Sequence, residues 1–353
     1  MHIVHITPYM ERGGTERCIR NLAREALARG STVSLVSPPG SGLDEVSPDI
    51  AVLMLDCWKI SSLRRSLRSL HTTLTSLGDG VDIIHVHAAA EMAFWAKRCR
   101  PDTPVVFTCH GYDNILPSYC NYWWAARFLK GIECTVALNP LDRDYFQSAG
   151  LGQGRVVFIP NGVEEMFFAN EVNGENKSDY LRVGIVGRLA KQKNISWAIK
   201  AMARYGFADE LQVVGDGPLR AALEKLARRQ KVAASIRFLG YRDDVHSLYS
   251  KLSALLVCSR NEAGQLVILE ALAAGVPVFI PRWLTGIVRL WENVSGVIVY
   301  ADGLDLKEKL ARIVPAIDRK SIQDVTRRFA WPHAFGAYNE LYQRLCRRQG
   351  ARQ

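Results

Sequence analysis

Short apolar segments alternate with amphipathic helical segments along the chain, and this alternation starts afresh once. In the first half, the pattern predicts strands at His2–Thr7, Thr32–Ser37, Ile50–Asp56, Asp82–His87, Pro104–His110, Cys134–Asn139 and Val156–Pro160. In the second half, it predicts strands at Arg182–Gly187, Leu211–Val214, Ile236–Leu239, Ala254–Ser259, Pro277–Pro281 and Gly296–Tyr300. Their Val- and Ile-rich composition is typical of parallel strands that helices cover on both faces. The chain is therefore predicted to be an α/β protein with two parallel sheets.

The segment Ala169–Asp179 is polar, carries no apolar periodicity and separates the two halves. We therefore expect a Rossmann-like domain over residues 1–168, a linker over 169–180 and a second Rossmann-like domain over 181–330. Residues 331–353 are expected to form a closing helix that packs back on the first domain. Two such domains would face a cleft, and ligands of these sheets bind beyond the carboxyl ends of the strands.

The composition is that of an ordinary globular protein, with 48% hydrophobic and 23% charged residues, which excludes fibrous and largely disordered classes. None of the eight cysteines forms a Cys-x-x-Cys pair, so reduced thiols are expected rather than zinc or disulfides. The N-terminus has no basic region followed by an apolar stretch, and no apolar run approaches the roughly 20 residues of a membrane helix. The sequence thus predicts a cytoplasmic protein.

Paired glycines, Gly13 and Gly14, follow the first predicted strand and begin the next helix. Glycines let a ligand approach the backbone, and the free amides at a helix start can hold a phosphate. A bare turn is the alternative. The full Gly-x-Gly-x-x-Gly fingerprint is absent, which weakens a nicotinamide hypothesis.

Two cations, Arg188 and Lys193, stand five residues apart on the loop after the first strand of the second half. They could clamp a diphosphate, with the Arg guanidinium as a planar fork and the Lys ammonium as a point charge. A solvated basic loop is the alternative.

Two carboxylates, Glu262 and Glu270, flank the start of a later helix. The amides of Gly264, Gln265 and Leu266 at that helix start could face an anion. Glu270 stands in an apolar stretch, where an ionised group needs a specific partner, and the vicinal hydroxyls of a sugar would provide one. The alternative is one carboxylate beside the helix dipole and one on the surface.

The ordered set of these motifs resembles the retaining glycosyltransferases of the GT-B fold, family 4. The segments that carry the resemblance are Gly13-Gly14, Thr108-Cys109-His110-Gly111, Ile159-Pro160-Asn161-Gly162-Val163, Gly187-Arg188-Leu189 with Lys193, Val214-Gly215-Asp216-Gly217-Pro218, and Glu262 to Glu270 followed by Ala273-Ala274-Gly275-Val276-Pro277. The resemblance covers nearly the whole chain.

The resemblance implies a role for each motif. Arg188 and Lys193 would neutralise the donor diphosphate without a metal ion or another cofactor. Glu270 would hold the ribose, and Glu262 would bind the transferred sugar. His110 would contact that sugar near the reacting carbon, and Gly14 would bring backbone to the phosphates. The leaving phosphate would itself take the acceptor's proton on the same face, which gives retention.

The chain also departs from the family pattern. Ala263-Gly264-Gln265 replaces the Gly-Phe-Gly that often follows the first Glu, so the donor sugar cannot be carried over. Arg289 stands where a Glu is common, which leaves the role of that loop open. A UDP-sugar is favoured because UDP is the commonest nucleotide of the family, and GDP-mannose is the alternative.

An acceptor side is expected in the first domain. The residues assigned to it are Thr15, Glu16, His87, Tyr112 and Trp123. Aromatic side chains near His110 could stack on sugars, with core packing as the alternative. No further His or carboxylate at a suitable spacing accompanies the strand-end histidines, so no metal site is predicted.

The segment Ser61–Leu77 places five leucines on one helical stripe, Leu63, Leu67, Leu70, Leu74 and Leu77. Arg64, Arg65 and Arg68 lie on the opposite face. A surface helix packed by its leucines is the simplest interpretation. The alternative is a basic face for anionic lipid headgroups at the inner side of the membrane, consistent with the net charge of +10.

The predicted function is transfer of a hexose-type sugar from a nucleotide-diphosphate sugar, with retention, to a glycan or lipid-linked acceptor. Such a reaction serves the synthesis of cell-surface polysaccharides or glycoconjugates. One alternative is a nucleotide-sugar epimerase of the same fold, which would convert the donor with no acceptor present. A basic nucleic-acid- or membrane-binding protein is the non-enzymatic alternative, although the sequence carries no specific nucleic-acid signature.

Overall fold

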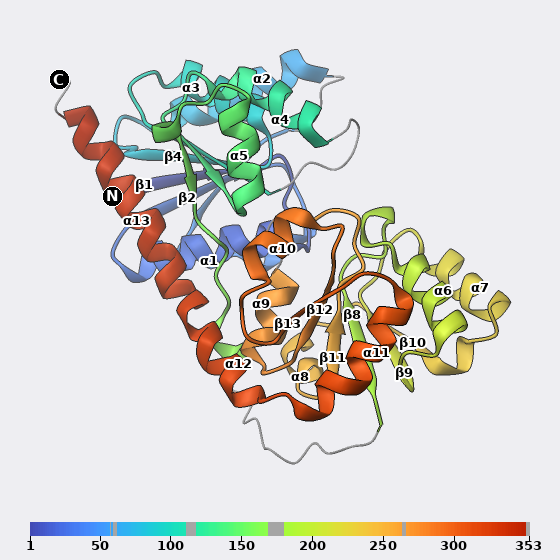
Figure 1. The fold of residues 1–353 in the computed structure, drawn as a ribbon. Helices are drawn as coiled ribbons and strands as arrows, with labels where there is room; N and C mark the ends of the chain where they lie inside the picture. Colours follow the sequence, from blue (N-terminus) through green and yellow to red (C-terminus); the bar gives the residue numbers. More distant parts are fainter. Residues whose placement is uncertain (57, 59–61, 111–117, 169–179, 263–265, 351–353) are drawn as a thin grey trace. The chain divides into compact units, whose positions relative to one another are not determined.

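A computed structural model describes the chain apart from residues 57, 59–61, 111–117, 169–179, 263–265 and 351–353. The chain divides into two compact units (Figure 1). The first unit comprises Met1–Gly162 and Trp331–Gln353, and the second comprises Val163–Ala330. The polar segment predicted as a linker, Ala169–Asp179, lies outside the described residues.

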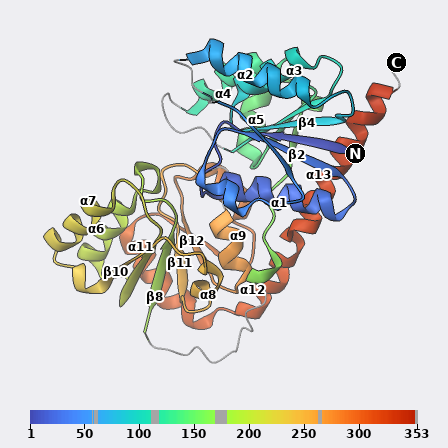
Figure 2. The same cartoon turned by 180° about the vertical axis from the view of Figure 1, so that it is seen from behind.

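The first unit is built on a parallel sheet of seven strands in the order β3-β2-β1-β4-β5-β6-β7. The strands are β1 (His2–Ile6), β2 (Thr32–Ser37), β3 (Ala51–Met54), β4 (Ile83–His87), β5 (Val105–Cys109), β6 (Cys134–Ala137) and β7 (Val156–Phe158). The helices are α1 (Gly14–Ala28), α2 (Leu63–Ser76), α3 (Ala90–Cys99), α4 (Ser118–Leu129), α5 (Pro140–Ser148) and α13 (Trp331–Gly350). Helices α2 to α5 cover one face of the sheet, and α1 and α13 cover the other (Figures 1 and 2).

The second unit is built on a parallel sheet of six strands in the order β10-β9-β8-β11-β12-β13. The strands are β8 (Arg182–Val186), β9 (Glu210–Val214), β10 (Ile236–Gly240), β11 (Ala254–Leu256), β12 (Val278–Pro281) and β13 (Val297–Tyr300). The helices are α6 (Ile195–Tyr205), α7 (Arg220–Arg229), α8 (Val245–Tyr249), α9 (Leu266–Ala273), α10 (Thr285–Trp291), α11 (Gly303–Ile313) and α12 (Arg319–Thr326). One core packs under α8, α9, α10 and α12, and another under α6, α7 and α11.

The predicted fold class is confirmed, since each predicted strand forms and all of them pair in parallel. In both sheets the first strand lies inside the sheet and the order reverses beside it, as in doubly wound Rossmann-like sheets. Most strands end before the predicted residue. The Val257 amide still donates to the Phe279 carbonyl of β12 at 2.9 Å, whereas residues 258 and 259 are buried but lie beyond β11, because apolar character marks burial and not strand pairing.

Helix α13 packs against α1 within the first unit. The ring of Trp331 lies against Gly162, where a Cβ would come within 2.6 Å of the indole. Further along the helix, Tyr338 and Tyr342 are fully buried. This helix therefore completes the core on the α1 side of the first sheet.

Helix α2 has the amphipathic character that its leucines predict, with one exception. Leu70 and Leu74 are fully buried, while Arg64 and Arg65 are exposed. Leu63, predicted on the packed stripe, is 38% exposed instead, because it stands in the first turn of the helix, outside the part that packs into the core. Among the described residues, no helix is both long and apolar enough to cross a membrane.

The loops that follow β8 and β9 pack backbone against backbone through glycines. The Gly187 amide donates to the Val214 carbonyl at 3.0 Å, and the Leu189 amide donates to the Asp216 carbonyl at 2.9 Å. Gly215 has φ +125°, and a Cβ there would lie 2.1 Å from the Gly187 carbonyl oxygen. These contacts fix the loop that carries Arg188.

We predict that Gly215→Ala destabilises the protein by more than the matched change Gly206→Ala. In Gly206→Ala the new Cβ has no atom within 4 Å. The only loss of stability is therefore that of placing an alanine in the left-handed conformation, about 1 kcal/mol. The Gly215 substitution adds a backbone clash to a strained conformation that alone costs about 1–3 kcal/mol. Urea unfolding of both variants measures the difference, and equal losses would contradict this packing.

Candidate functional site

The polar groups of the second unit gather at the carboxyl end of its sheet. Strands β8 and β11 are paired neighbours, so the loops that follow them lie side by side. The β8 loop carries Arg188 and Lys193, and the β11 loop carries Ser259 and Glu262. This follows from parallel pairing, which places the ends of adjacent strands at one edge.

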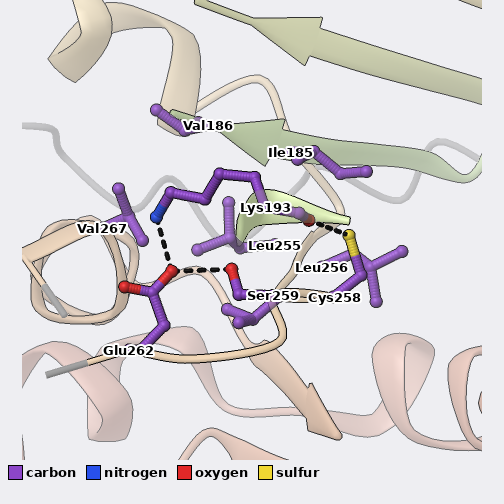
Figure 3. Close-up of a pocket in the computed structure, with 10 residues that line it drawn as sticks. Ile185, Val186, Lys193, Leu255, Leu256, Cys258, Ser259, Glu262 and Val267 are labelled. Atoms are coloured by element: carbon purple, nitrogen blue, oxygen red, sulfur yellow. Dashed lines mark hydrogen bonds and ion pairs between the residues drawn. The ribbon is translucent and has the colours of Figure 1, made fainter. Parts of the chain in front are cut away.

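Lys193 and Glu262 form an ion pair at the centre of this edge (Figure 3). The Nζ of Lys193 lies 2.5 Å from Oε1 of Glu262, and the Ser259 hydroxyl donates to the same oxygen at 2.6 Å. Their side chains are 16% and 10% exposed. The pair is therefore largely desolvated, and its charges compensate each other.

Backbone contacts hold the two loops together around the ion pair. The Arg260 amide donates to the Gln192 carbonyl at 2.8 Å, and the Gln192 side-chain amide donates to the Asn261 carbonyl at 3.1 Å. The stem of Lys193 passes close to Gly187, where a Cβ would lie 2.9 Å from the Lys193 Cε. Because Gly187 has no side chain, the Lys193 side chain can occupy the space beside it.

A small pocket lies beside the ion pair, and the empty space of about 250 Å³ at this place includes open solvent. Its polar lining comes from Lys193, Ser259 and Glu262 (Figure 3). Its apolar lining comes from Ile185, Val186, Leu255, Leu256, Val257 and Val267. Charged, polar and apolar side chains thus share a small pocket whose enclosed part has room for about one water molecule.

Arg188 is exposed on the β8 loop, which also carries Lys193. No residue that the structure describes makes an ion pair with Arg188. Leu266 begins α9 and is half-buried. Gly264 and Gln265, which precede it and were assigned to donor binding, lie outside the described residues.

Glu270 is buried in α9, with 2% of its surface exposed. The hydroxyl of Tyr249, at the end of α8, donates to its Oε2 at 2.8 Å. The sequence predicts that this carboxylate needs a specific partner, and Tyr249 is one that sequence reasoning missed. No motif marks this tyrosine, because the contact depends on how α8 packs against α9.

The glycine loop of the first unit begins α1. Gly13 is the N-cap in an extended conformation, no side chain caps the helix start, and Gly13 and Gly14 are exposed. Thr15 is half-buried. Glu16, assigned to the acceptor side, is buried, and its carboxylate turns back to accept the Glu11 amide at 3.3 Å.

Four histidines meet at the carboxyl end of the first sheet. The register pairs His5 of β1 with His85 of β4, and His87 lies two residues further on the same face. Nδ1 of His5 lies 3.0 Å from Nε2 of His87, and Nδ1 of His87 lies 3.0 Å from Nε2 of His110. His87, assigned to the acceptor side, is fully buried because its strand lies inside the sheet.

One nitrogen from each of His5, His85 and His87 lies within 4.8 Å of the others, a grouping that could hold a metal ion. The sequence predicts no metal site, because no further His or carboxylate at a suitable spacing was found beside the strand-end histidines. In the structure, His85 is hydrogen-bonded to the Tyr342 hydroxyl at 2.6 Å and to the Thr108 hydroxyl at 2.7 Å. The grouping is therefore a hydrogen-bonded cluster of imidazoles and hydroxyls.

The aromatic residues near His110 divide between core and surface. Tyr122 is buried and donates a hydrogen bond to Asp142 at 2.5 Å, as the core alternative predicts. Trp123 is 59% exposed, with the Arg127 guanidinium 5.8 Å from its ring centre. Tyr112 lies outside the described residues.

Comparison with known proteins identifies the family. A family model described as Glycosyltransferase Family 4 matches residues 12–166, and one described as Glycosyl transferases group 1 matches residues 181–315. The structure of HepE from Anabaena in complex with UDP superposes with a TM-score of 0.81 at 17% identity, over 97% of this chain and 100% of that chain. The chain is a family 4 glycosyltransferase of the GT-B fold.

Two relatives match this glycosyltransferase over most of its length. The putative glycosyltransferase EpsF of Bacillus subtilis is 24% identical over 88% of this chain and 85% of its own. The second, from Campylobacter jejuni, is 24% identical over 89% of both chains. Its name is "GalNAc-alpha-(1->4)-GalNAc-alpha-(1->3)-diNAcBac-PP-undecaprenol alpha-1,4-N-acetyl-D-galactosaminyltransferase".

Burial keeps the histidine cluster of the glycosyltransferase neutral. It lowers the pKa of His5 to about 4 and the pKa of His110 to about 3. Burial and the neighbouring rings hold the pKa values of His85 and His87 well below the usual range. Near pH 7 these imidazoles therefore carry no charge, and each has one N–H donor and one bare acceptor nitrogen.

We predict that this glycosyltransferase loses stability as the pH falls from 6.5 towards 4. The folded pKa of His5 lies below its unfolded value of 6.5, so the unfolded chain binds the proton more readily throughout this window. Replacing His5 by Phe removes one such titration and reduces the slope by up to about 1.4 kcal/mol per pH unit.

Urea unfolding at several pH values measures these slopes. The exposed His71 on α2 provides the control, since His71→Gln leaves the cluster intact. Equal slopes for the wild type and His5→Phe would show that burial of His5 does not oppose its protonation.

Proposed function

We propose that this glycosyltransferase transfers a hexose-type sugar from a nucleotide-diphosphate sugar, with a UDP-sugar as the favoured donor, to a glycan or lipid-linked acceptor with retention of configuration. The observation that carries the proposal is the Lys193–Glu262 ion pair at the carboxyl end of the second sheet, with Arg188 exposed on the same loop as Lys193. Such a set offers cations for a diphosphate and a carboxylate for sugar hydroxyls within one edge of the sheet.

The donor diphosphate binds to Arg188 and Lys193. Arg188 is exposed and can meet a phosphate with two parallel N–H donors. Lys193 is held at the pocket by Glu262 and by its place beside Gly187. As the glycosidic bond breaks, negative charge builds on the leaving phosphate, and two fixed cations stabilise that charge without a metal ion.

The sugar and nucleoside are held by carboxylates. Glu262 accepts hydrogen bonds from hydroxyls of the transferred sugar, with help from the amides at Gly264, Gln265 and Leu266. Glu270 accepts hydrogen bonds from the ribose hydroxyls. These either replace or add to the hydrogen bond that the Tyr249 hydroxyl donates to Glu270. The leaving phosphate oxygen takes the acceptor's proton on the face that it leaves, which accounts for retention.

The relatives support the chemical classes of donor and acceptor. UDP is the ligand in the Anabaena HepE structure, and an undecaprenol-linked glycan is the acceptor that the name of the Campylobacter enzyme states. We propose the same classes of donor and acceptor for this chain. Its reaction would then serve the synthesis of cell-surface polysaccharides or glycoconjugates. GDP-mannose is the alternative donor.

We predict that Arg188→Ala weakens UDP binding by roughly tenfold or more, because a charge-assisted hydrogen bond contributes about 1.5–3 kcal/mol. Lys191→Ala is the matched control, since Lys191 is an exposed cation of the same loop. Calorimetric titration of the wild type and of each variant with UDP and with GDP measures these affinities. Equal affinities of the two variants and the wild type would remove Arg188 from the diphosphate site.

Incubation with the nucleotide sugar separates the possible reactions. A glycosyltransferase releases the nucleoside diphosphate faster when an acceptor is present. Conversion of the donor sugar to an isomer without any acceptor would instead show an epimerase, and the proposal would then be wrong.

We also propose that α2 faces an anionic membrane surface. Arg64, Arg65 and Arg68 are exposed on this helix. Helices α2 and α4 both pack against α3 (Figure 1). Trp123 and Trp124 of α4 are exposed. Basic and aromatic side chains are the groups that favour a headgroup region.

We predict that changing Arg64, Arg65 and Arg68 to Gln weakens binding to phosphatidylglycerol vesicles by more than about tenfold, since each Arg contributes about 1 kcal/mol near such a surface. The control changes the exposed cations Lys225, Arg228 and Arg229 of α7 to Gln, which removes the same charge elsewhere. Cosedimentation measures both. Equal binding of the two triple variants would exclude α2 as the contact.

A further inference from the structure

Three imidazoles of the first unit form a continuous hydrogen-bonded chain that runs from the core towards the end of the sheet. His5 contacts His87 at 3.0 Å, and His87 contacts His110 at 3.0 Å through its other nitrogen. His5 and His87 are fully buried, whereas His110 keeps some exposed surface. Only the last ring of the chain can therefore reach a ligand.

The protons of this chain are coupled. A neutral imidazole has one N–H donor and one acceptor nitrogen, so each ring must donate at one contact and accept at the other. If His87 donates to His110, it must accept from His5. If His87 accepts from His110, it must donate to His5. The tautomer of the buried rings thus determines which nitrogen of His110 carries the proton.

The inner end of the chain selects between these two arrangements. Nε2 of His5 is buried and has no hydrogen-bond partner among the residues that the structure describes. If the protons point inward, this nitrogen is an N–H group without an acceptor. If they point outward, it is a bare acceptor. Buried donors without a partner are rarer in proteins than buried acceptors without one, so the outward arrangement is favoured.

The surroundings of His87 hold the chain in place and contribute no charge near pH 7. His85 of β4 packs against His87 with ring centres 4.1 Å apart, and it is fixed by Thr108 of β5 and Tyr342 of α13. The other titratable groups that face the cluster are Tyr338 of α13, beside His85, and the rings of the chain itself. Burial raises the pKa values of Tyr338 and Tyr342, so both stay neutral as well.

We propose that His87, supported by His5, is a positioning residue that holds His110 in the tautomer with its proton on Nδ1. In this tautomer, Nε2 of His110 accepts from His87, and Nδ1 offers a hydrogen-bond donor to an oxygen of a bound ligand. The ligand's identity, a donor sugar, rests on the proposed function, whereas the tautomer follows from the cluster alone.

Nitrogen-15 NMR of the histidine-labelled full chain near pH 7 tests the tautomer directly. The signals of His110 are assigned by their loss in His110→Asn. We expect a protonated Nδ1 and an unprotonated Nε2 in the wild type, and His87→Leu is expected to remove this preference. A wild-type His110 protonated at Nε2, or a His110 signal that His87→Leu leaves unchanged, would overturn the proposal.

Kinetics test whether the tautomer matters for turnover. His87→Leu is expected to lower kcat/KM by roughly tenfold, the effect of one misdirected hydrogen bond. His87→Asn is expected to restore most of it, because the Asn amide can donate to His110 near the place of Nδ1. UDP affinity is expected to stay unchanged in both variants. Equal kcat/KM for the Leu variant and the wild type would overturn the proposed role of His87.

The outcomes separate this inference from the proposed function. If the wild type neither binds UDP nor transfers sugar, the proposed function fails, and the NMR result still decides the tautomer. Titration with zinc supplies the last check. Loss of the hydrogen-bonded His5 and His87 signals at stoichiometric zinc would show that the cluster is a metal site, and the positioning role would be wrong.

Discussion

The ion pair of the second unit and the histidine cluster of the first depend on one constraint, that the strands of a parallel sheet all end at the same edge. Lys193 and Glu262 are 69 residues apart, and they meet because β8 and β11 are neighbours at the point where the strand order reverses. The same holds for the histidines, since β1, β4 and β5 are consecutive neighbours in the first sheet. A sheet with another strand order would hold the same residues apart.

The same constraint limits what could be predicted from the sequence alone. The Val- and Ile-rich segments identified the strands, and the polar residues after them led to the prediction of ligand-binding loops. The ion pair between Lys193 and Glu262 was not predictable, because spacing along the chain does not give strand order. Strand ends were misjudged for a related reason: Cys258 and Ser259 are buried although they lie beyond the end of β11, so burial continues past the last paired residue.

Buried polar contacts were beyond the sequence for a different reason. The partner of Glu270 is Tyr249, at the end of a five-residue helix whose packing no periodicity reveals. The contact of His5 with His87 requires the register of two strands that are about 80 residues apart. Glu16 and His87 were assigned to the acceptor side, and their burial was not predicted from their place at the start of a helix and the end of a strand. Neither position determines which way a side chain turns.

The two glutamates of the second unit illustrate how a resting site can keep charges near an apolar pocket. Removing a carboxylate from water is costly unless a cation or hydrogen-bond donors compensate it. Lys193 and the Ser259 hydroxyl compensate Glu262, and the Tyr249 hydroxyl donates to Glu270. Under the proposed function, a diphosphate carries more negative charge than one carboxylate, so it competes for the ammonium of Lys193. The same step would free an oxygen of Glu262 to accept from a sugar hydroxyl, which couples binding of the phosphates to binding of the sugar.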